Sequence, residues 1–512
     1  MLHERNGLQT PGQGHRSTLK QLRKMLFILV RTGRQSVWPR TSYNAEGCLD
    51  MADRPLSINI RRPLILKSND LVLLTREDGG IPGFGLFYRD TCYLDTYTLR
   101  LHGTEPMRLS ASDSNGMVAR IGLSNLRLRT SNGEEIPDHR ISVGRTLLLP
   151  PDGTSFTDTL VFRNAGTADV TLPVTLDLAT TFESMFALRG APPGWRGRLH
   201  PPEWDGASLR FAYEGADGLR RTLLLAFSVP VLVAPCTAER TTVHVSLVLP
   251  PGEERALTAI LQVDERPFGK EPPPAAPALP GPGEVQAARE ASAAALTRGY
   301  ARLESPSDGL AGVVARSLAD LALLEVRREG HRFTAAGVPW FVGLFGRDSL
   351  LPTIQCLPFN PDLGARTTRV LAHWQGTRND PYTREEPGKI LHELRVGEMA
   401  RLGEVPQTPS YAAVDATLIF LVAIAATATG PAASTCCARC GRTSTTPWLG
   451  STAMRRPPRA ATSSTTAPRR AASRRTRAGA IPDTGCCAPT APTPSRRSHS
   501  WKCRATPIRH AA

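Results

Sequence analysis

The segment VPWFVGLFGRDSL, residues Val338–Leu350, places an apolar aromatic run directly before Arg347 and Asp348. Burying an unpaired charge beside so much aromatic surface is costly, so each of these charges needs a partner. In one interpretation, Arg347 and Asp348 are an N-cap and a structural ion pair that open a helix. In the other, they hold hydroxyl groups of a bound sugar, while Trp340 and Phe341 offer ring faces to its apolar side.

A second stretch, PGKILHELRVGEMARLGEVPQTPSYAAVDATLIF (residues 387–420), again sets polar side chains among apolar helical runs. Carboxylates, guanidinium groups, amides and phenols are the side chains that hydrogen-bond to sugar hydroxyls. The candidate substrate-binding residues in this stretch are His392, Glu393, Arg395, Gln407, Tyr411 and Asp415.

The motifs AAGVPWFVGLFGRDSL, PGKILHELRVGEMA and SYAAVDAT resemble the bacterial glycogen-debranching or amylo-alpha-1,6-glucosidase-like family over residues 300–427. An upstream stretch, GIPGFGLFYRDTCYLDTYTLRLHG (Gly80–Gly103), is similar to the N-terminal β-rich domain of that family. The resemblance implies a six-hairpin (α/α)6 catalytic barrel, an alpha-glucan or oligosaccharide substrate, and Arg347 and Asp348 as ligands of the glucose whose bond is cut.

The net charge of +16 over 512 residues first suggests a nucleic-acid partner, but it is concentrated at the two ends. Residues 429–512 carry +14 and residues 1–50 carry +5, which leaves −3 for residues 51–428. We therefore expect a nearly neutral globular protein with a basic extension at each end, and no nucleic-acid partner for the body of the chain.

The cysteines of the body are scattered singly, which favours a reducing compartment and a cytoplasmic protein. The apolar run MLFILV (residues 25–30) is too short to span a bilayer, so no membrane association is expected. No residue pattern suggests a metal site or a cofactor. The sequence leaves the oligomeric state open.

Changes in composition and periodicity predict an α+β multidomain protein. Residues 1–54 form a basic extension without a predicted fold, and residues 55–265 form an antiparallel β-sandwich of many short strands. A Pro-rich linker covers 266–285. Residues 286–427 supply the first helices of an incomplete (α/α)6 toroid, and residues 428–512 form a disordered tail.

Apolar spacing predicts the individual helices of the toroid, and Ala416–Ala426 is expected to be a buried barrel helix. The other predicted helices begin at Gln286 and Gly309 and cover Leu350–Leu357, Gly364–Gln375 and Lys389–Leu402. In the upstream motif FYRDTCYLD, Arg89 and Asp90 are interpreted as a charged pair at a sheet edge or domain seam, because no second titrating group accompanies them.

The tail from about Thr429 has almost no acids or branched aliphatic residues, and three explanations compete for it. An Arg-rich nucleic-acid arm lacks interleaved aromatic residues. A zinc module lacks paired CxxC spacing among Cys436, Cys437, Cys440, Cys486 and Cys487. The third explanation is a GC-rich coding sequence read in the wrong frame: Trp501 followed by Lys502 forces a glutamate codon in the shifted frame. There, residues 494–508 can be read as EPPIALVEVQGYAY.

Glycoside hydrolysis needs a carboxylic acid and a carboxylate. The resemblance implies that both belong to the sequence lost after the frame change, so the chain has no assigned catalytic residue and Glu393 is only a weak candidate. We expect the chain as written to be inactive as a glycosidase. The alternatives are a non-catalytic alpha-glucan-binding protein and a nucleic-acid-binding protein that uses the Arg-rich tail.

Resequencing of codons 425–435 is expected to show an inserted or deleted base, because helix-forming protein sequence reappears in the shifted frame. A messenger RNA that encodes the tail as written would contradict the frameshift and would favour the nucleic-acid alternative.

Overall fold

The computed structural model describes residues 64–429, with gaps at 114–115, 130–132, 134, 192, 195, 236, 238 and 306–307 and over most of 270–297. The extension predicted at 1–54 lies outside the described residues. Three further predicted segments also lie outside the described residues. They are the tail predicted at 428–512, apart from its first two residues, most of the linker, and most of the helix predicted from Gln286.

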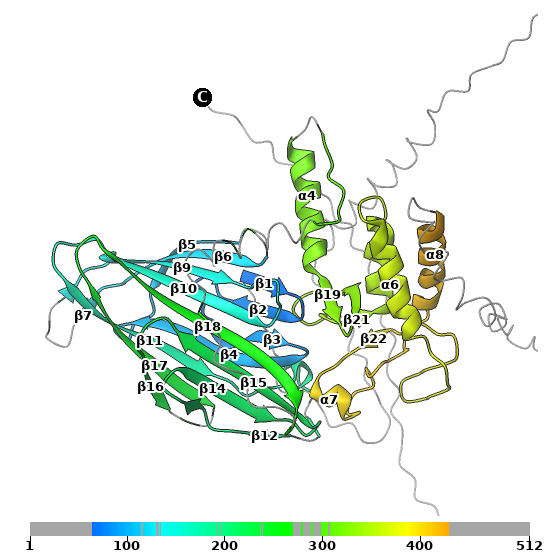
Figure 1. Ribbon diagram of the computed structural model, residues 1–512, viewed down its shortest axis with the longest axis horizontal. Coiled ribbons are helices and arrows are strands. Elements are labelled where there is room, and N and C mark those ends of the chain that lie inside the picture. The colour runs from blue at the N-terminus through cyan, green and yellow to red at the C-terminus, as the bar shows by residue number, and fades with distance from the viewer. Residues whose placement is uncertain are drawn as a thin grey trace, which may run out of the picture. The chain divides into compact units, whose positions relative to one another are not determined.

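Two antiparallel sheets make up the first part of the chain, hereafter the sandwich (Figure 1). The seven-stranded sheet has the strand order β1 (Leu64–Ser68), β2 (Leu71–Thr75), β3 (Ile81–Tyr88), β4 (Thr91–Leu101), β11 (Val170–Ala179), β17 (Arg240–Leu249) and β16 (Leu232–Pro235). Sequential strands β1 to β4 pair as hairpins, whereas β11 and β17 join this sheet from later in the chain.

The second sheet has nine strands and contains the long strand β18 near its centre. Its order is β12 (Arg198–Leu199), β14 (Ser208–Glu214), β15 (Leu219–Phe227), β18 (Glu254–Pro267), β10 (Ser155–Asn164), β9 (Ile141–Leu148), β6 (Val118–Ser124) and β5 (Met107–Asp113), with β13 (Glu203–Trp204) also on β14. Strands β7 (Leu128–Arg129) and β8 (Glu135–Ile136) form a separate small ribbon, and helix α2 (Met185–Leu188) is one turn long. The predicted antiparallel β architecture of this region is confirmed.

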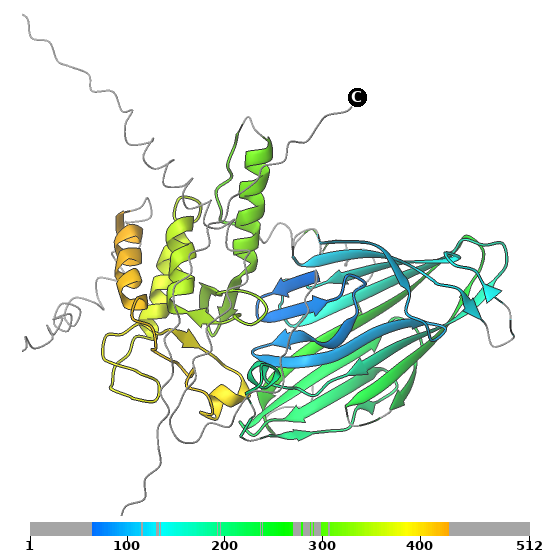
Figure 2. The same ribbon diagram turned by 180° about the vertical axis from the view of Figure 1, so that it is seen from behind.

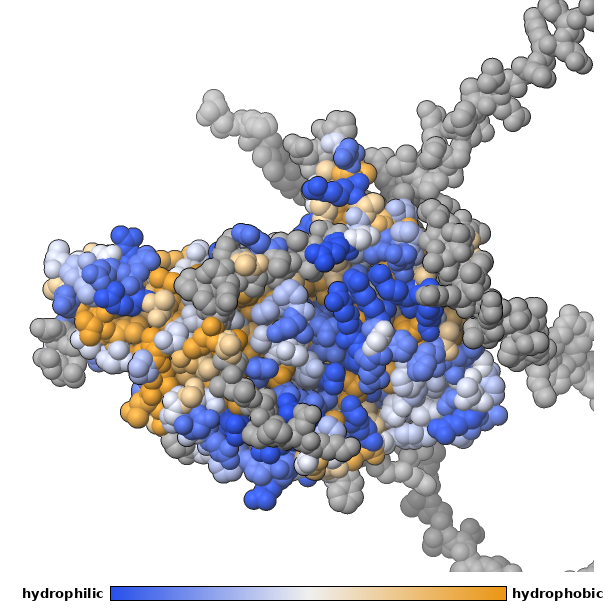
Figure 3. Space-filling model, viewed as in Figure 1, coloured by the Kyte–Doolittle hydropathy of each residue, from blue (hydrophilic) through white to orange (hydrophobic). Residues whose placement is uncertain are grey.

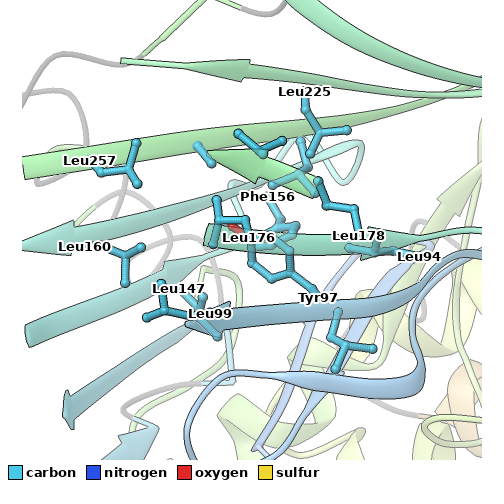
Figure 4. Close-up of a cluster of buried hydrophobic side chains, with 14 of the residues drawn as sticks. Leu94, Tyr97, Leu99, Leu147, Phe156, Leu160, Leu176, Leu178, Leu225 and Leu257 are labelled. Atoms are coloured by element: carbon cyan, nitrogen blue, oxygen red, sulfur yellow. The ribbon is translucent and has the colours of Figure 1, made fainter. Parts of the chain in front are cut away.

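Alternation along the strands builds the core of the sandwich. In β17, buried and exposed residues follow one another with a period of two, as a strand with one face on the core requires. Apolar side chains from both sheets meet between the layers, and Figure 4 shows Leu94, Tyr97, Phe156 and Leu225 among them. Each fully buried side chain of this kind stabilises the fold by roughly 1.5–3 kcal/mol. On the face drawn in Figure 3, apolar residues also show at the surface of the sandwich.

Five helices and two ribbons make up the second part of the chain, hereafter the helical segment, residues 308–429. The elements are α4 (Asp308–Leu323), β19 (Glu325–Arg328), β20 (His331–Thr334), β21 (Leu344–Phe345), α5 (Gly346–Cys356), α6 (Pro361–His373), β22 (Glu393–Leu394), α7 (Glu398–Arg401) and α8 (Ala416–Thr429). Helices α5, α6 and α8 pack on one another around Leu350, Leu371 and Phe420. Figure 2 shows α8, in orange, beside α6.

Three sequence expectations for the helical segment need correction. The helix predicted from Gly309 ends at Leu323, and the EVRR that follows is strand β19, where Glu325 and Val326 are buried. The helix predicted at Lys389–Leu402 is mostly loop with the short elements β22 and α7. Helix α8 is only half buried: Phe420 is covered, whereas Leu418 is 58% exposed. The incomplete (α/α)6 toroid remains a prediction.

A network of ion pairs, hereafter the seam network, joins the sandwich to the helical segment. The sandwich contributes four carboxylates and two arginines: Asp70, Asp90, Asp217, Glu265, Arg89 and Arg221. The helical segment contributes three arginines and one carboxylate: Arg328, Arg395, Arg401 and Glu393. The ten groups have no net charge together, but the sandwich side carries −2 and the helical side +2.

A buried lysine adds a further link between the two parts. The Nζ atom of Lys67 in β1 donates to the main-chain oxygen of Leu323, 2.8 Å away, and to that of Glu325, 3.2 Å away. Carbonyl groups at the end of a helix lack intrahelical partners, and the Lys67 amine supplies a donor to them. Burial lowers the pKa of this amine to about 7. Lys67 therefore fixes the end of α4 against the sandwich.

Asp95 in β4 generates a prediction about the pH dependence of stability. Its carboxylate is buried without a hydrogen bond of ordinary geometry, and burial raises its pKa from 3.8 to about 6. Since the folded state then binds the proton more tightly than the unfolded state, the unfolding free energy should fall by about 3 kcal/mol as pH rises from about 4 to above 6. Asp95→Asn should remove this fall, as measured by urea unfolding at a series of pH values.

The exposed carboxylate of Asp169 supplies a matched control, because Asp169→Asn should leave the pH profile of the wild type unchanged. An Asp95→Asn profile parallel to that of the wild type would contradict the prediction.

Candidate functional site

A two-stranded ribbon brings the two sequence motifs together. Strands β21 and β22 pair antiparallel, with Leu344 opposite Leu394 and Phe345 opposite Glu393. The amide of Gly346 also donates to the main-chain oxygen of His392 at 3.0 Å. The motif around residue 347 and the motif around residue 392 therefore form one local structure, although 45 residues of sequence separate them.

Gly346 is the point of closest approach between these motifs. A Cβ atom at this position would lie 2.1 Å from the main-chain oxygen of Leu391 and 3.0 Å from the Cβ of Ala416. Only glycine therefore lets helix α5 begin directly against the chain at residues 391–392. Helix α5 begins at this glycine, so Arg347 and Asp348 lie in its first turn and neither is its N-cap.

Arg347, Asp348 and Asp415 form an exposed charged cluster, hereafter the 347 cluster. The Nη1 atom of Arg347 donates to Oδ2 of Asp415 at 3.0 Å, and its Nε lies 3.9 Å from Oδ2 of Asp348. The Arg347 guanidinium lowers the pKa of Asp415, so this group is a carboxylate at neutral pH. All three side chains are 38–46% exposed, and exposed ion pairs contribute about 0–1 kcal/mol to stability. The cluster can exchange its internal contacts for ligand hydroxyls at small cost to the fold.

Aromatic rings lie beside the ribbon. Phe345 packs edge-on against Phe341 at 6.0 Å and against the His392 imidazole at 6.1 Å between ring centroids. Phe341 is 41% exposed, and the Arg189 guanidinium lies 5.8 Å from its ring centroid. Phe341 thus offers partly open ring surface, as its predicted contact with a sugar requires.

Arg395 and Glu393 are placed differently from the 347 cluster. Arg395 is buried, and its Nε donates to Oε1 of Glu393 at 2.5 Å. Its Nη2 donates to the main-chain oxygen of Trp340 at 2.8 Å, and its Nη1 donates to Oδ1 of Asp90 in the sandwich at 2.9 Å. The Trp340 ring packs edge-on against Phe87. Arg395 was predicted to bind substrate, and its three nitrogens are all hydrogen-bonded within the protein.

Two further candidates do not join the 347 cluster. Tyr411 belongs to the apolar core of the helical segment, and its hydroxyl donates to the main-chain oxygen of Trp374 at 2.9 Å. Gln407 accepts the Arg395 amide with its main-chain oxygen, and its side-chain Oε1 is buried without a hydrogen bond. The predicted binding role of Tyr411 and Gln407 stays a prediction.

Sequence reasoning missed the connection from Asp90 to the candidate site. Asp90 lies 305 residues before Arg395, and no local pattern links them. The sequence interpretation of Arg89 and Asp90 as a charged pair at a sheet edge or domain seam needs correction: the two do not pair with each other. Arg89 pairs with Asp70 and Glu265, and Asp90 pairs with Arg395.

The described residues contain no group of His, Cys, Asp and Glu that could hold a metal ion. Cys92 and Cys356, the cysteines with a described state, are free and buried. Within the same residues, no helix has the length and apolarity needed to cross a membrane.

A cavity of about 210 Å³ lies among Phe333, Trp374 and Arg395, and the 347 cluster does not line it.

Residues 66–259 match the family described as the N-terminal domain of some glycogen debranching enzymes. The chain carries a glycogen-debranching-type N-terminal domain. This domain coincides with the sandwich and ties the chain to carbohydrate-active enzymes. A comparison with curated protein sequences gave no match.

Solved structures with a similar course of the chain include a "Putative kojibiose phosphorylase" from the human microbiome, at 11% identity and a TM-score of 0.41 over 68% of this chain. The matched region spans 48% of the length of that protein. A galactose mutarotase-like protein from Lactobacillus casei matches at 7% identity and a TM-score of 0.25, over 40% of this chain and 100% of its own. A heparan sulfate lyase from Pedobacter heparinus matches at 9% identity and a TM-score of 0.24, over 39% of this chain and 34% of its own.

The close contact at Gly346 predicts that Gly346→Ala lowers the free energy of unfolding by about 1–3 kcal/mol, because the added methyl group must displace the chain at Leu391. Gly312 in α4 is a matched control with no atom near its Cβ position. Gly312→Ala should raise stability by about 0.5–1 kcal/mol through helix propensity. Urea unfolding of both variants checks this, and equal effects of the two substitutions would contradict the close approach.

Proposed function

We propose that this chain binds α-glucans of the kind processed by glycogen-debranching amylo-alpha-1,6-glucosidases, and that the 347 cluster holds hydroxyl groups of a glucose unit. A guanidinium and two carboxylates offer donors and acceptors within one small area, and charge-assisted hydrogen bonds to hydroxyls are stronger than neutral ones. The rings of Phe341 and His392, close by on the ribbon, suit the apolar face of a sugar ring.

One observation carries the proposal: three charged side chains from two separated motifs converge on exposed surface, where their mutual ion pairs add little stability. A structural ion pair of importance to the fold would be buried, as the pair of Arg145 and Asp158 in the sandwich is. The debranching-type domain supports an α-glucan as the sugar.

Hydrolysis is the family activity that we expect for a frame-restored protein. It needs two carboxyl groups, one of which donates a proton. Glu393, Asp348 and Asp415 each lie beside an arginine. That environment suits a group that accepts hydroxyl hydrogen bonds better than one that donates a proton, and so all three are proposed as binding groups.

Asp348→Asn is expected to weaken the binding of a maltooligosaccharide or of glycogen by about tenfold or more, because a charge-assisted hydrogen bond is worth roughly 1.5–3 kcal/mol. Isothermal titration calorimetry of the 512-residue protein measures this. The free energy of unfolding should change by less than about 1 kcal/mol.

Asp362 supplies the matched control, since it is an exposed acid in the first turn of α6 as Asp348 is in the first turn of α5. Asp362→Asn should bind the glucan as the wild type does. Absence of glucan binding by the wild type would overturn the proposal. A loss of stability without a loss of affinity in Asp348→Asn would favour the structural ion pair.

A further inference from the structure

The tip of the β3–β4 hairpin reaches from the sandwich to the candidate site. Tyr88 pairs with Thr91, so Arg89 and Asp90 are the two residues of the turn. Both have positive φ, 48° and 66°, as two-residue hairpin turns require. Asn-Gly and Asp-Gly usually fill such turns, because most residues with a Cβ atom are strained in the left-handed backbone region. The presence of Arg89 and Asp90 in this turn therefore suggests that their side-chain contacts matter more than the backbone strain.

Asp90 uses every acceptor that it has on two other segments. Its Oδ1 accepts from Arg395 at 2.9 Å, and its Oδ2 accepts the amides of Val396 and Gly397 at 3.0 and 3.2 Å. Its main-chain oxygen accepts the amide of Met185 at 2.8 Å. A buried carboxylate with three charge-assisted or amide hydrogen bonds on one loop fixes the position of that loop strongly.

The loop held by Asp90 leads directly to candidate binding residues. Through Arg395, the hydrogen bonds continue to the Glu393 carboxylate and to the main-chain oxygen of Trp340. Glu393 pairs with Phe345 in the ribbon. Phe345 lies directly before Gly346, which is followed by the 347 cluster. The series of contacts thus runs from Asp90 through Arg395 to both strands that carry the candidate site.

We infer that Asp90 is a positioning residue for the α-glucan site, so that the sandwich holds the binding surface of the helical segment in its binding geometry. This inference rests on the proposed function. Asp90 itself would touch no sugar, because it is buried and its oxygens are bonded to the 395–397 loop.

A hydrogen bond outside the seam network offers a control that crosses the same interface without reaching Arg395. The Tyr213 hydroxyl in β14 donates to Oε2 of Glu398 in α7 at 2.8 Å. Tyr213→Phe removes this bond and weakens the seam elsewhere. A purely structural role for Asp90 would make Asp90→Asn and Tyr213→Phe equivalent in every measurement except the size of the stability loss.

Glucan affinity by calorimetry separates the two roles. Asp90→Asn should weaken binding by about tenfold or more, whereas Tyr213→Phe should bind as the wild type does. Wild-type affinity in a folded Asp90→Asn protein would overturn the inference and would leave the proposed function intact, because the latter depends on Asp348.

Amide hydrogen exchange followed by mass spectrometry tests the positioning without any ligand. Asp90→Asn should speed exchange at 340–342 and 391–397, while Tyr213→Phe should not. Unchanged protection of both segments in Asp90→Asn would overturn the inference, even if the wild type binds no glucan.

A second variant covers the case in which Asp90→Asn does not fold. A Cβ atom at Gly397 would lie 2.9 Å from the Cβ of Asp90, so Gly397→Ala pushes the loop from the turn without changing a charge. It should reproduce the faster exchange at 391–397 and the weaker binding. Normal exchange and normal affinity in this variant would also contradict the inference.

Discussion

The buried guanidinium of Arg395 is the group on which the arrangement of the second half of the chain depends. It lies between a carboxylate of the sandwich, Asp90, and one of its own segment, Glu393. A charge placed this deeply is tolerated only when hydrogen bonds replace the lost water, and removal of one partner from such a pair costs roughly 3–5 kcal/mol. The chain therefore has a strong energetic reason to keep the hairpin turn, the ribbon and the Trp340 backbone in one fixed relation.

Two kinds of charged group follow from this constraint, and burial distinguishes them. Arg395 and Asp90 are almost fully covered, and their attraction acts with little screening by solvent. Arg347 and Asp415 face water, where the same attraction is weak. A fold can use the first kind to define geometry while the second kind stays available to a ligand. The sequence alone does not distinguish these two kinds of charged residue, because burial depends on the fold.

Periodicity was sufficient for the regular elements. Alternation predicted the sandwich, and apolar spacing predicted α5 and α6, because in these elements one face is buried. Helix α8 was predicted from its continuous apolar composition instead. The ribbon of β21 and β22 escaped prediction because each strand has two residues, too few to show a period. The short elements at 389–402 were mistaken for a helix for the same reason, although Gly397 marks a loop there.

The sequence named candidate residues for the site but not their arrangement in space. The motif around Arg347 and the later residue Asp415 were both named as candidates, because exposed charges on loops and helix ends stand out against apolar runs, and the structure brings them together. The different fates of Arg395 and Tyr411 depend on contacts with segments that are distant in sequence: the hairpin turn of the sandwich and the main chain of Trp374. No alternation or spacing reports such contacts.

The unequal charge on the two sides of the seam network has a consequence for the parts taken separately. Within the seam network, the sandwich side is acidic and the helical side is basic by the same amount. Two surfaces of this kind attract each other over a distance of about one Debye length and repel copies of themselves. Complementary charge therefore favours the docking of the helical segment on the sandwich over the association of like parts.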